Sequence, residues 1–221
     1  EPISQEIIID VDENVINFYY TKRTDLEYTV NYLEQGTEEV LAENKVVTDQ
    51  TYKSSVTEEA IEIEGYTKVE PTSQTIEIDV DGNVINFYYT KRTDLEYTVK
   101  YLELGTENAL AEEKIVTGQT FKSVVTEQAI DIPGYTKEEP VEQSIEIAVE
   151  DNEIIFYYKK IDGLVYTVKY LEQGTEVEIA PEKIVDGNTF NDVVLETAIE
   201  IEGYNGQEPL EQSIVIGLDE N

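Results

Sequence analysis

The chain of 221 residues contains no cysteine, histidine, methionine or tryptophan. Without cysteine, neither a disulfide nor a thiolate-bound zinc ion can stabilise its domains. Without histidine, it lacks the commonest general base and metal ligand. Adjacent carboxylates, such as Glu58 with Glu59 and Glu112 with Glu113, do not face each other on a helix and arise by chance among 49 acidic residues. Because we also find no cofactor motif, the sequence predicts a protein that is not an enzyme and has no cofactor.

Basic residues are scarce as well, since 15 lysines and arginines stand against 49 acidic residues, which gives a formal net charge of -34. Such a charge repels nucleic acid and anionic membranes. No apolar run approaches the ~20 residues that a membrane-spanning helix requires. We therefore expect no nucleic-acid partner and no membrane insertion in this part of the protein.

What the chain does contain is a repeat. The sequence VINFYYTKRTDLEYTV occurs at Val15–Val30 and again, unchanged, at Val84–Val99, and a looser copy lies at Glu153–Val168. A constant period of 69 residues without insertions predicts an array of small domains. The predicted boundaries are 1–27 for the closing hairpin and linker of a preceding repeat, 28–96 and 97–165 for the first and second repeats, and 166–221 for a third repeat that lacks its last strand.

The first half of each repeat predicts two strands and a helix. In YTVNYLE the residues of Tyr28–Glu34 alternate as in a half-buried strand, Gly36 suits a tight turn, and Val40–Val47 would return as a second strand. Ser54 then suits a helix N-cap, and Val56 lies four residues before Ala60. We expect one helix of about two turns here.

The second half predicts a closing hairpin, after a short extra strand near Tyr66–Val69. Thr75–Val80 alternates, the sequence Asp81-Gly82-Asn83 suits a hairpin turn, and the return strand would place Ile85, Phe87 and Tyr89 in the core. The expected fold class is α+β, a small mixed sheet covered by one short helix.

This order of motifs resembles the mucin-binding-protein (MucBP) repeat family of Gram-positive surface adhesins. The residues that carry the resemblance are YTVNYLE with its turn glycine, the Gly65-Tyr66 pair and the closing INFYYTK. The resemblance implies tandem β-grasp (ubiquitin-like) repeats with parallel, adjacent first and last strands, arranged as an elongated rod. It also implies secretion and attachment to the Gram-positive cell wall outside this segment. It supplies no catalytic residues and no ligand contacts.

Two segments have the alternating oxygen ligands with which calcium loops begin. They comprise Asp10, Asp12 and Asn14, and Asp79, Asp81 and Asn83. The alternative is a polar turn, because no glutamate stands at the distal ligand position and Ala148 replaces the first aspartate in the next copy.

A second candidate site consists of the first tyrosine in each Tyr-Tyr pair, Tyr19, Tyr88 and Tyr157. Adjacent strand residues point to opposite faces, so these rings would leave the core and could stack on a sugar or a protein partner. The alternative is that the helix or the next repeat covers this face. Lys100 and Lys169 suit an amide crosslink, although Asn31 occupies their position in the first repeat.

Three functions follow from these features. The first is the extended stalk of a cell-surface adhesin, and the second is a module that binds host glycan or mucin. The third is a subunit of a head-to-tail filament, because Val15–Tyr20 is a strand without a domain and the third repeat has an open slot beside its first strand. The expected partners are therefore neighbouring repeats of the same or another chain.

Overall fold

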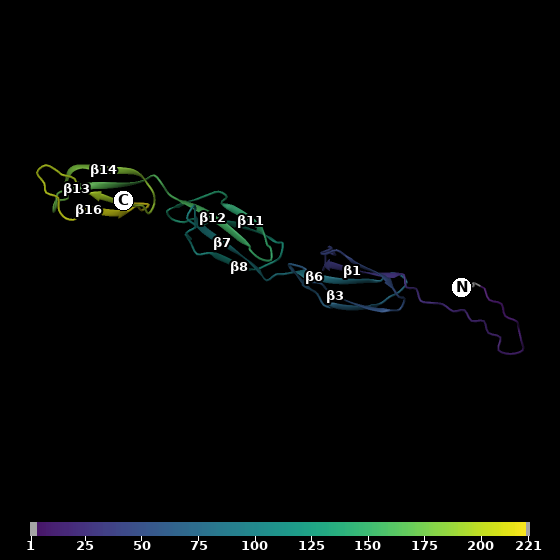
Figure 1. The fold of residues 1–221 in the computed structure, drawn as a ribbon. Coiled ribbons are helices and arrows are strands. Elements are labelled where there is room, and N and C mark those ends of the chain that lie inside the picture. The colour runs from purple at the N-terminus through teal and green to yellow at the C-terminus, as the bar shows by residue number, and fades with distance from the viewer. Residues whose placement is uncertain (1–3, 220–221) are drawn as a thin grey trace. The chain divides into compact units, whose positions relative to one another are not determined.

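The computed structural model describes residues 4–219, and these residues form strands and loops only. They divide into two compact units, Glu1–Arg92 and Thr93–Asn221. Figure 1 labels some of the strands of each unit, such as β1 and β6 in the first and β7 and β12 in the second. Residues 4–25 contain no strand. Within residues 4–219 there is also no helix that is long and apolar enough to cross a membrane.

The first unit contains one four-stranded sheet, in the order β2-β1-β6-β4, and one two-stranded sheet, β3-β5. β1 pairs with β6 in parallel, with Thr29 opposite Val84 and Glu34 opposite Tyr89. The parallel pairing of the first and last strands, which the resemblance implied, is thus present. The strands are β1 (Leu26–Glu34), β2 (Lys45–Gln50), β3 (Ser55–Glu59), β4 (Tyr66–Lys68), β5 (Ser73–Glu77) and β6 (Val84–Lys91).

The predicted helix is wrong, and with it the α+β fold class: no helix occurs among residues 4–219. Residues 55–59 form β3, in which half-buried and exposed residues alternate. Val56 pairs with Ile76 of β5. The hydroxyl of Ser54 does not cap a helix, because it donates to the carbonyl of Thr51 at 2.7 Å. The β-branched residues of this segment favour a strand, and cross-strand pairing outweighs a weak helical spacing.

The predicted closing hairpin is also wrong, because β5 pairs with β3, whereas β6 pairs with β1 and β4. The segment Asp79–Asn83 therefore connects two sheets. Its turn residues still close a loop: the amide of Asn83 donates to the carbonyl of Asp79 at 2.8 Å and to that of Glu27 at 3.0 Å. The second strand begins later than Val40, which makes only an isolated bridge to Leu33. The short strand predicted near Tyr66–Val69 is confirmed as β4.

The second unit contains the second and third repeats. The second repeat has the topology of the first, with sheets β10-β12-β7-β8 and β11-β9, whereas the third has the pairs β13-β14 and β15-β16. The strands are β7 (Leu95–Glu103), β8 (Lys114–Gln119), β9 (Val124–Gln128), β10 (Tyr135–Lys137), β11 (Glu142–Glu146), β12 (Glu153–Lys160), β13 (Leu164–Leu171), β14 (Glu178–Asn188), β15 (Val193–Thr197) and β16 (Glu211–Val215).

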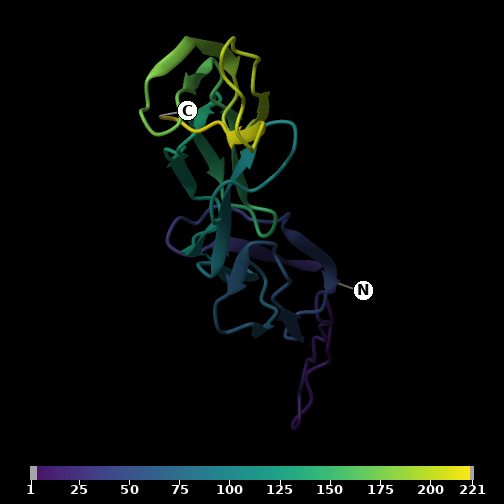
Figure 2. The same cartoon turned by 90° about the vertical axis from the view of Figure 1, so that its left-hand side faces the viewer.

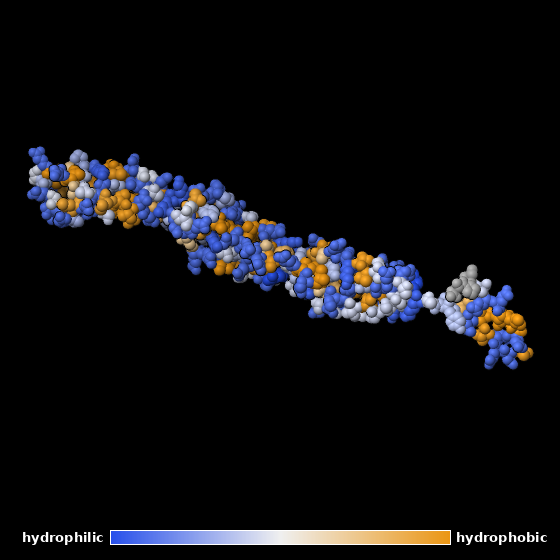
Figure 3. Space-filling model, viewed as in Figure 1, coloured by the Kyte–Doolittle hydropathy of each residue, from blue (hydrophilic) through white to orange (hydrophobic). Residues whose placement is uncertain are grey.

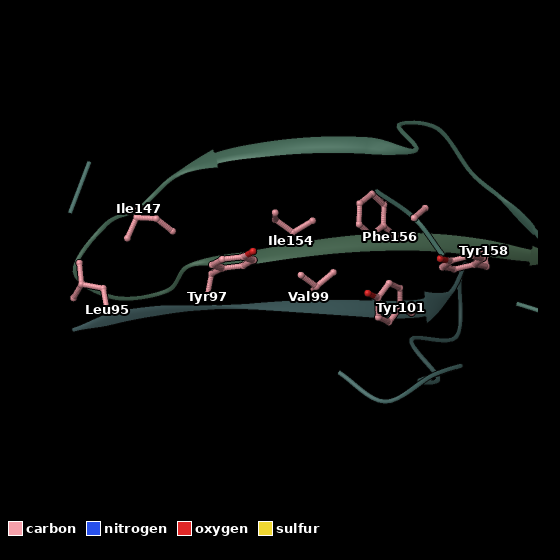
Figure 4. Packing of buried hydrophobic residues seen from close by; sticks show 9 residues of the cluster. Leu95, Tyr97, Val99, Tyr101, Ile147, Ile154, Phe156 and Tyr158 are labelled. Carbon is pink, nitrogen blue, oxygen red and sulfur yellow. The ribbon is translucent and has the colours of Figure 1, made fainter. Parts of the chain in front are cut away.

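The core of the second repeat lies on one face of the β7-β12 pair. Figure 4 shows Val99 and Tyr101 of β7 beside Ile154, Phe156 and Tyr158 of β12. The three β12 side chains are at most 1% exposed. In the first repeat Ile85, Phe87 and Tyr89 are equally buried, as the alternation predicted. The last strand of each complete repeat therefore supplies much of its core.

Candidate interaction site

The site is a cleft in the third repeat, beside β13. In the first two repeats the first strand has a partner on each side, β2 and β6 for β1, and β8 and β12 for β7. β13 pairs with β14 alone among the described strands. The edge of β13 that corresponds to the parallel partner is therefore unpaired among the described strands.

A cleft of about 230 Å³ opens at this edge. Its walls are β13 on one side and the β15-β16 pair with the loop before β16 on the other. The lining residues combine apolar side chains with backbone and side-chain hydrogen-bonding groups. They are Tyr166, Thr167, Val168, Lys169, Tyr170, Val194, Glu196, Thr197, Ala198, Pro209, Leu210, Gln212 and Ile214.

Apolar residues that are buried in the second repeat are more exposed at this cleft. Val99 and Tyr101 are 0% and 5% exposed, whereas their counterparts Val168 and Tyr170 are half-buried. Ala129 is buried, but Ala198 is exposed. Covering such an apolar surface with another apolar surface removes it from water and lowers the free energy of the system.

Polar groups of the cleft have counterparts that hold β12 in the second repeat. The amide of Gln143 donates to the carbonyl of Ile155 at 2.6 Å, and the counterpart of Gln143 in the cleft is Gln212. The hydroxyl of Tyr158 donates to the carbonyl of Ile130 at 3.0 Å. The cleft therefore has the features that bind a last strand in the complete repeats.

The segment before β1 has the sequence of a last strand but pairs with nothing in the described structure. Val15–Lys22 is identical to β6, yet residues 15–22 are not in a strand. Phe18 and Tyr20 are 54% and 91% exposed. Figure 2 shows the chain before β1 in purple as a trace without arrows, and Figure 3 shows apolar residues gathered on this N-terminal part of the chain.

A polar cluster that the sequence analysis missed recurs in all three repeats. In the second repeat, the Tyr97 hydroxyl donates to Oε1 of Glu127 at 2.5 Å, and Lys114 Nζ lies 2.6 Å from the same oxygen. The counterparts are Tyr28, Lys45 and Glu58, and Tyr166, Lys183 and Glu196. The signal was available, because these three residue types recur at the 69-residue period.

This cluster shifts the pKa values of its members. Burial, together with the hydrogen bond to Glu127, raises the pKa of Tyr97 to about 12. Burial raises the pKa of Glu127, but hydrogen bonds from Lys114 and Tyr97 outweigh it, and the pKa of Glu127 is lowered. The cluster joins β7, β8 and β9. Because β9 belongs to the smaller sheet, the cluster connects the two sheets of the repeat.

The three tyrosines of the predicted ring-stacking site differ in their exposure to solvent. Tyr19 is 89% exposed, whereas Tyr88 and Tyr157 are half-buried. The backbone carbonyls of Tyr88 and Tyr157 accept hydrogen bonds from Val69 and Glu138, both at 2.9 Å. The ring-stacking role of these tyrosines stays a prediction.

The candidate calcium ligands lie in two loops of the same geometry. Asn14 accepts from the backbone N–H of Asp10 at 2.7 Å, and Asn83 accepts from that of Asp79 at 2.8 Å. Asp12 is exposed, and Oδ1 of Asp81 accepts from Gly82 N–H at 2.8 Å. Among residues 4–219, no group of three or more Asp, Glu, His or Cys side chains is placed to hold a metal ion.

The second repeat contains the same loop without its first aspartate, because the N–H of Ala148 donates to Asn152 at 2.7 Å. The loop therefore forms without a carboxylate at that position. Calcium binding stays a prediction, as does the amide crosslink. Lys100 forms an ion pair with Glu153, and its counterpart Asn31 donates to Asn86 at 2.8 Å.

No family model and no curated protein matches the sequence. The chain is similar to the solved structure of Mub-RV, with 11% identity and a TM-score of 0.23 over 61% of this chain and 98% of that chain. It is similar to the type 2 repeat of the mucus binding protein MUB from Lactobacillus reuteri, with 14% identity and a TM-score of 0.22 over 61% of this chain and 99% of that chain.

The third similarity is to the Bacillus anthracis TIE protein, with 13% identity and a TM-score of 0.38. It covers 90% of this chain and 49% of that chain, so this chain spans about half of that structure. Because the TM-scores are 0.38 or less, we assign no family from these similarities.

Proposed function

We propose that this chain is a non-enzymatic repeat region of a secreted bacterial adhesin anchored to the Gram-positive cell wall, where it acts as an extended stalk. Its units are the repeats 28–96, 97–165 and 166–221, and its main partners are other repeats of the same kind. The resemblance of the sequence motifs to MucBP repeats supports the cellular setting. The net charge of -34 supports a strongly hydrated surface that does not adhere non-specifically.

The observation that carries the proposal is the junction between the second and third repeats. The rings of Tyr135 and Phe190 meet edge to face, with centroids 5.9 Å apart. A Cβ atom on Gly134 would lie 2.1 Å from Cε1 of Phe190, so only glycine admits this ring. The positive φ of Gly134, +85°, also favours glycine.

The connecting residue takes part in the same junction. Ile161 donates its N–H to the carbonyl of Gly134, and its own carbonyl accepts from the N–H of Phe190, both at 2.9 Å. The connection from Lys160 to Leu164 is too short to act as a flexible linker. The residue types of the junction recur 69 positions earlier in the sequence, at Gly65, Tyr66 and Phe121. A stalk requires an inflexible connection of this kind between its repeats.

Small-angle X-ray scattering on the chain, extrapolated to zero concentration, tests the stalk. A compact domain of this length would have a radius of gyration of about 17 Å. We expect a clearly larger value, and one near that figure would contradict the proposal. Phe190→Ala should broaden the distribution of interatomic distances because the junction loosens. The matched control is Tyr204→Ala, since Tyr204 is the third-repeat counterpart of Tyr135 and is 47% exposed.

Binding of host glycan or mucin is the second candidate function. The observation that favours it is the exposed ring of Tyr19, together with the half-buried Tyr88 and Tyr157 at equivalent positions. A glycan array, probed with and without calcium, tests this role. Binding that Tyr88→Ala and Tyr157→Ala abolish would support it, and no signal in either condition would leave the stalk alone.

A further inference from the structure

The four-stranded sheet of the first repeat, β2-β1-β6-β4, has an outer face that the core does not use. Its inner face carries the buried side chains, and the residues that alternate with them point outward. We define the outer face by its outward residues Thr29, Asn31, Leu33, Val46, Thr48, Thr67, Val84, Asn86, Tyr88 and Thr90. None of these residues is charged, and Glu27 at the start of β1 borders them. The face thus differs from the rest of a chain whose net charge is -34.

Two apolar rows cross the outer face. In one row, Val46 and Val84 lie on either side of Thr29, and they are 55% and 46% exposed. In the other row, Leu33 lies beside Tyr88, and both are half-buried. Thr29 and Leu33 are four residues apart on β1, so the rows are roughly 13 Å apart. The face therefore presents apolar groups that a partner can remove from water.

The polar groups between the two rows bind each other. The side-chain amide of Asn31 donates to Oδ1 of Asn86 at 2.8 Å. A partner that covers this pair does not break its hydrogen bond, which lowers the cost of burying it. In the second repeat the same positions hold Lys100 and Ile155, and Lys100 forms an ion pair with Glu153. The uncharged face is therefore a property of the first repeat.

The smaller sheet of the same repeat has an outer face of a different kind. The outward residues of β3 and β5 are all exposed, and they are Ser55, Thr57, Glu59, Ser73, Thr75 and Glu77. These residues include no aliphatic side chain, and the hydroxyls of Thr57 and Thr75 share a hydrogen bond of 2.8 Å. Such a surface suits contact with water. The two outer faces of one repeat therefore differ in a way that strand geometry does not require.

Strand direction also favours a cover on the outer face of the larger sheet. Its two central strands, β1 and β6, run parallel. Sheets of parallel strands are almost always covered on both faces, whereas antiparallel sheets commonly leave one face in water. β3 and β5 are antiparallel. The pairing in each sheet thus agrees with the composition of its outer face.

Charge limits which partner fits this face. A basic partner would be drawn to the acidic surfaces of the chain rather than to an uncharged one. Two copies of this chain repel each other through those acidic surfaces, because each has a net charge of -34. Two outer faces, in contrast, bring uncharged side chains together. The surface that matches the outer face is therefore the same face of another copy.

We propose that the outer face of the first repeat binds the outer face of the first repeat in a second copy of this chain. The two sheets pack face to face about a two-fold axis, and the apolar rows of one copy contact those of the other. This inference goes beyond the proposed function, because a stalk requires only contacts within one chain. The interface described here joins two chains.

The size and symmetry of the interface determine how the chains associate. With about 4.8 Å between strands and about 3.3 Å per residue along them, the face measures roughly 20 Å by 20 Å. This projected area is smaller than the ~800 Å² per partner that standard interfaces bury, so the dimer is weak. Because a two-fold interface uses the same face of both copies, association ends at the dimer.

Sedimentation equilibrium on the full chain, at concentrations up to about 1 mM, tests the proposal. We expect the weight-average mass to rise from the monomer mass of 25.2 kDa towards twice that value and no further. Added salt should strengthen association, because it screens the repulsion between two acidic chains and there is no ion pair in the contact to weaken. Association that salt weakens would overturn the proposal.

A substitution that the second repeat already contains tests the face itself. Val84→Glu should weaken association by about tenfold or more, because it brings a carboxylate from each copy into an apolar contact. The fold accepts this residue, since Glu153 occupies the same position beside Thr98 in the second repeat. The matched control is Ser73→Glu, which adds the same charge to the smaller sheet, where the second repeat has Glu142. Equal weakening by the two variants would contradict the proposal.

NMR spectra of the methyl groups locate the contact. Shifts of Val46 and Val84 that follow dimer formation support the proposal, provided that Val124 does not shift. Val124 is an exposed residue of the smaller sheet of the second repeat, with 67% of its surface in water. Monomers at every concentration overturn the proposal. A monomeric chain in which a glycan shifts the methyl groups of Val46 and Val84 also overturns it, and assigns the face to the sugar.

The Val84→Glu variant also separates this inference from the stalk proposal. It should be a monomer at concentrations where the wild type associates. Scattering from this monomer tests the stalk, whatever the result for association. Failure of the stalk would therefore leave the interface between outer faces standing, and failure of the interface would leave the stalk standing.

Discussion

The second and third repeats share most of their sequence pattern, but the described part of the third has no strand that corresponds to β12 or to the short β10, which pairs with β12. In the second, β12 lies beside β7, and Val99 and Tyr101 are 0% and 5% exposed. In the third, β13 has no such neighbour among the described strands, and Val168 and Tyr170 are half-buried. The β15-β16 pair nevertheless forms with five residue pairs, as β9-β11 does. The smaller sheet therefore forms independently of the last strand, whereas the burial of the first strand depends on it.

This difference between the repeats separates two contributions to the fold. One is pairing between strands that follow each other in the chain, and the other is pairing between strands that are far apart in the chain. The strand β13 retains its antiparallel partner β14, which follows it in the chain. The last strand pairs across a whole repeat, about 55 positions away in register, as with Val99 and Ile154. A segment that pairs at such a distance contributes mainly through the apolar side chains that it buries.

The largest expected effect follows from adding that strand. Extension of the chain after Asn221 with the sequence of Glu153–Lys160 should stabilise the third repeat by several kcal/mol, because burying each Ile or Phe contributes about 1.5–3 kcal/mol. Hydrogen exchange of the β13 amides reads out the change. The same extension with aspartate at its phenylalanine position is the control. If both extensions protect β13 equally, apolar burial is not the cause.

Removing the side chain of Phe156, a core residue of β12, should make the core of the second repeat resemble the less buried core of the third. Phe156→Ala should lower its free energy of unfolding by about 3–5 kcal/mol, because Phe156 is fully buried. Phe18→Ala changes the same residue type at the same register position, where the side chain is 54% exposed. Urea unfolding of both variants, at a concentration where the chain is monomeric, provides the measurement. Equal destabilisation by the two would contradict the burial argument.

Alkaline pH should produce a smaller difference between the stabilities of the second and third repeats. Burial raises the pKa of Tyr158 from 10.0 to about 12. The unfolded chain therefore ionises first, and the stability that this residue contributes below pH 10 is lost as pH rises towards 12. The third repeat has no counterpart of Tyr158 among its described residues.

We therefore expect stability to fall more steeply with pH in the second repeat than in the third. Hydrogen exchange from pH 8 to pH 11, corrected for intrinsic rates, compares them within one sample. Tyr158→Phe should flatten the pH dependence of the second repeat because it removes the ionisable hydroxyl. If the stability of the second repeat in this variant falls with pH as steeply as in the wild type, another group causes the fall. Tyr97 is such a group, because its pKa is also raised to about 12.

The sequence predicted the strands whose side chains alternate strictly. The buried positions of β6 follow from alternation in VINFYYTK, and the repeats follow from the 69-residue period. β3 was mistaken for a helix because Val56 and Ala60 are four residues apart, a spacing that a strand with period two also satisfies. What decides the case is the pairing of Val56 with Ile76, which no local pattern contains.

The closing hairpin failed for a related reason. Asp81-Gly82-Asn83 has good turn residues, but a loop that connects two sheets needs the same residue types as a hairpin. The polar cluster was missed because its members lie on three strands, and Lys114 and Glu127 are 13 residues apart in sequence.

The parallel pairing of β1 with β6 determines how a repeat bears tension. A force that pulls on the start of β1 and the end of β6 acts along both strands, because they run in the same direction. The residue pairs from Thr29 and Val84 to Glu34 and Tyr89 are then loaded together in shear, rather than one after another as in an unzipping hairpin.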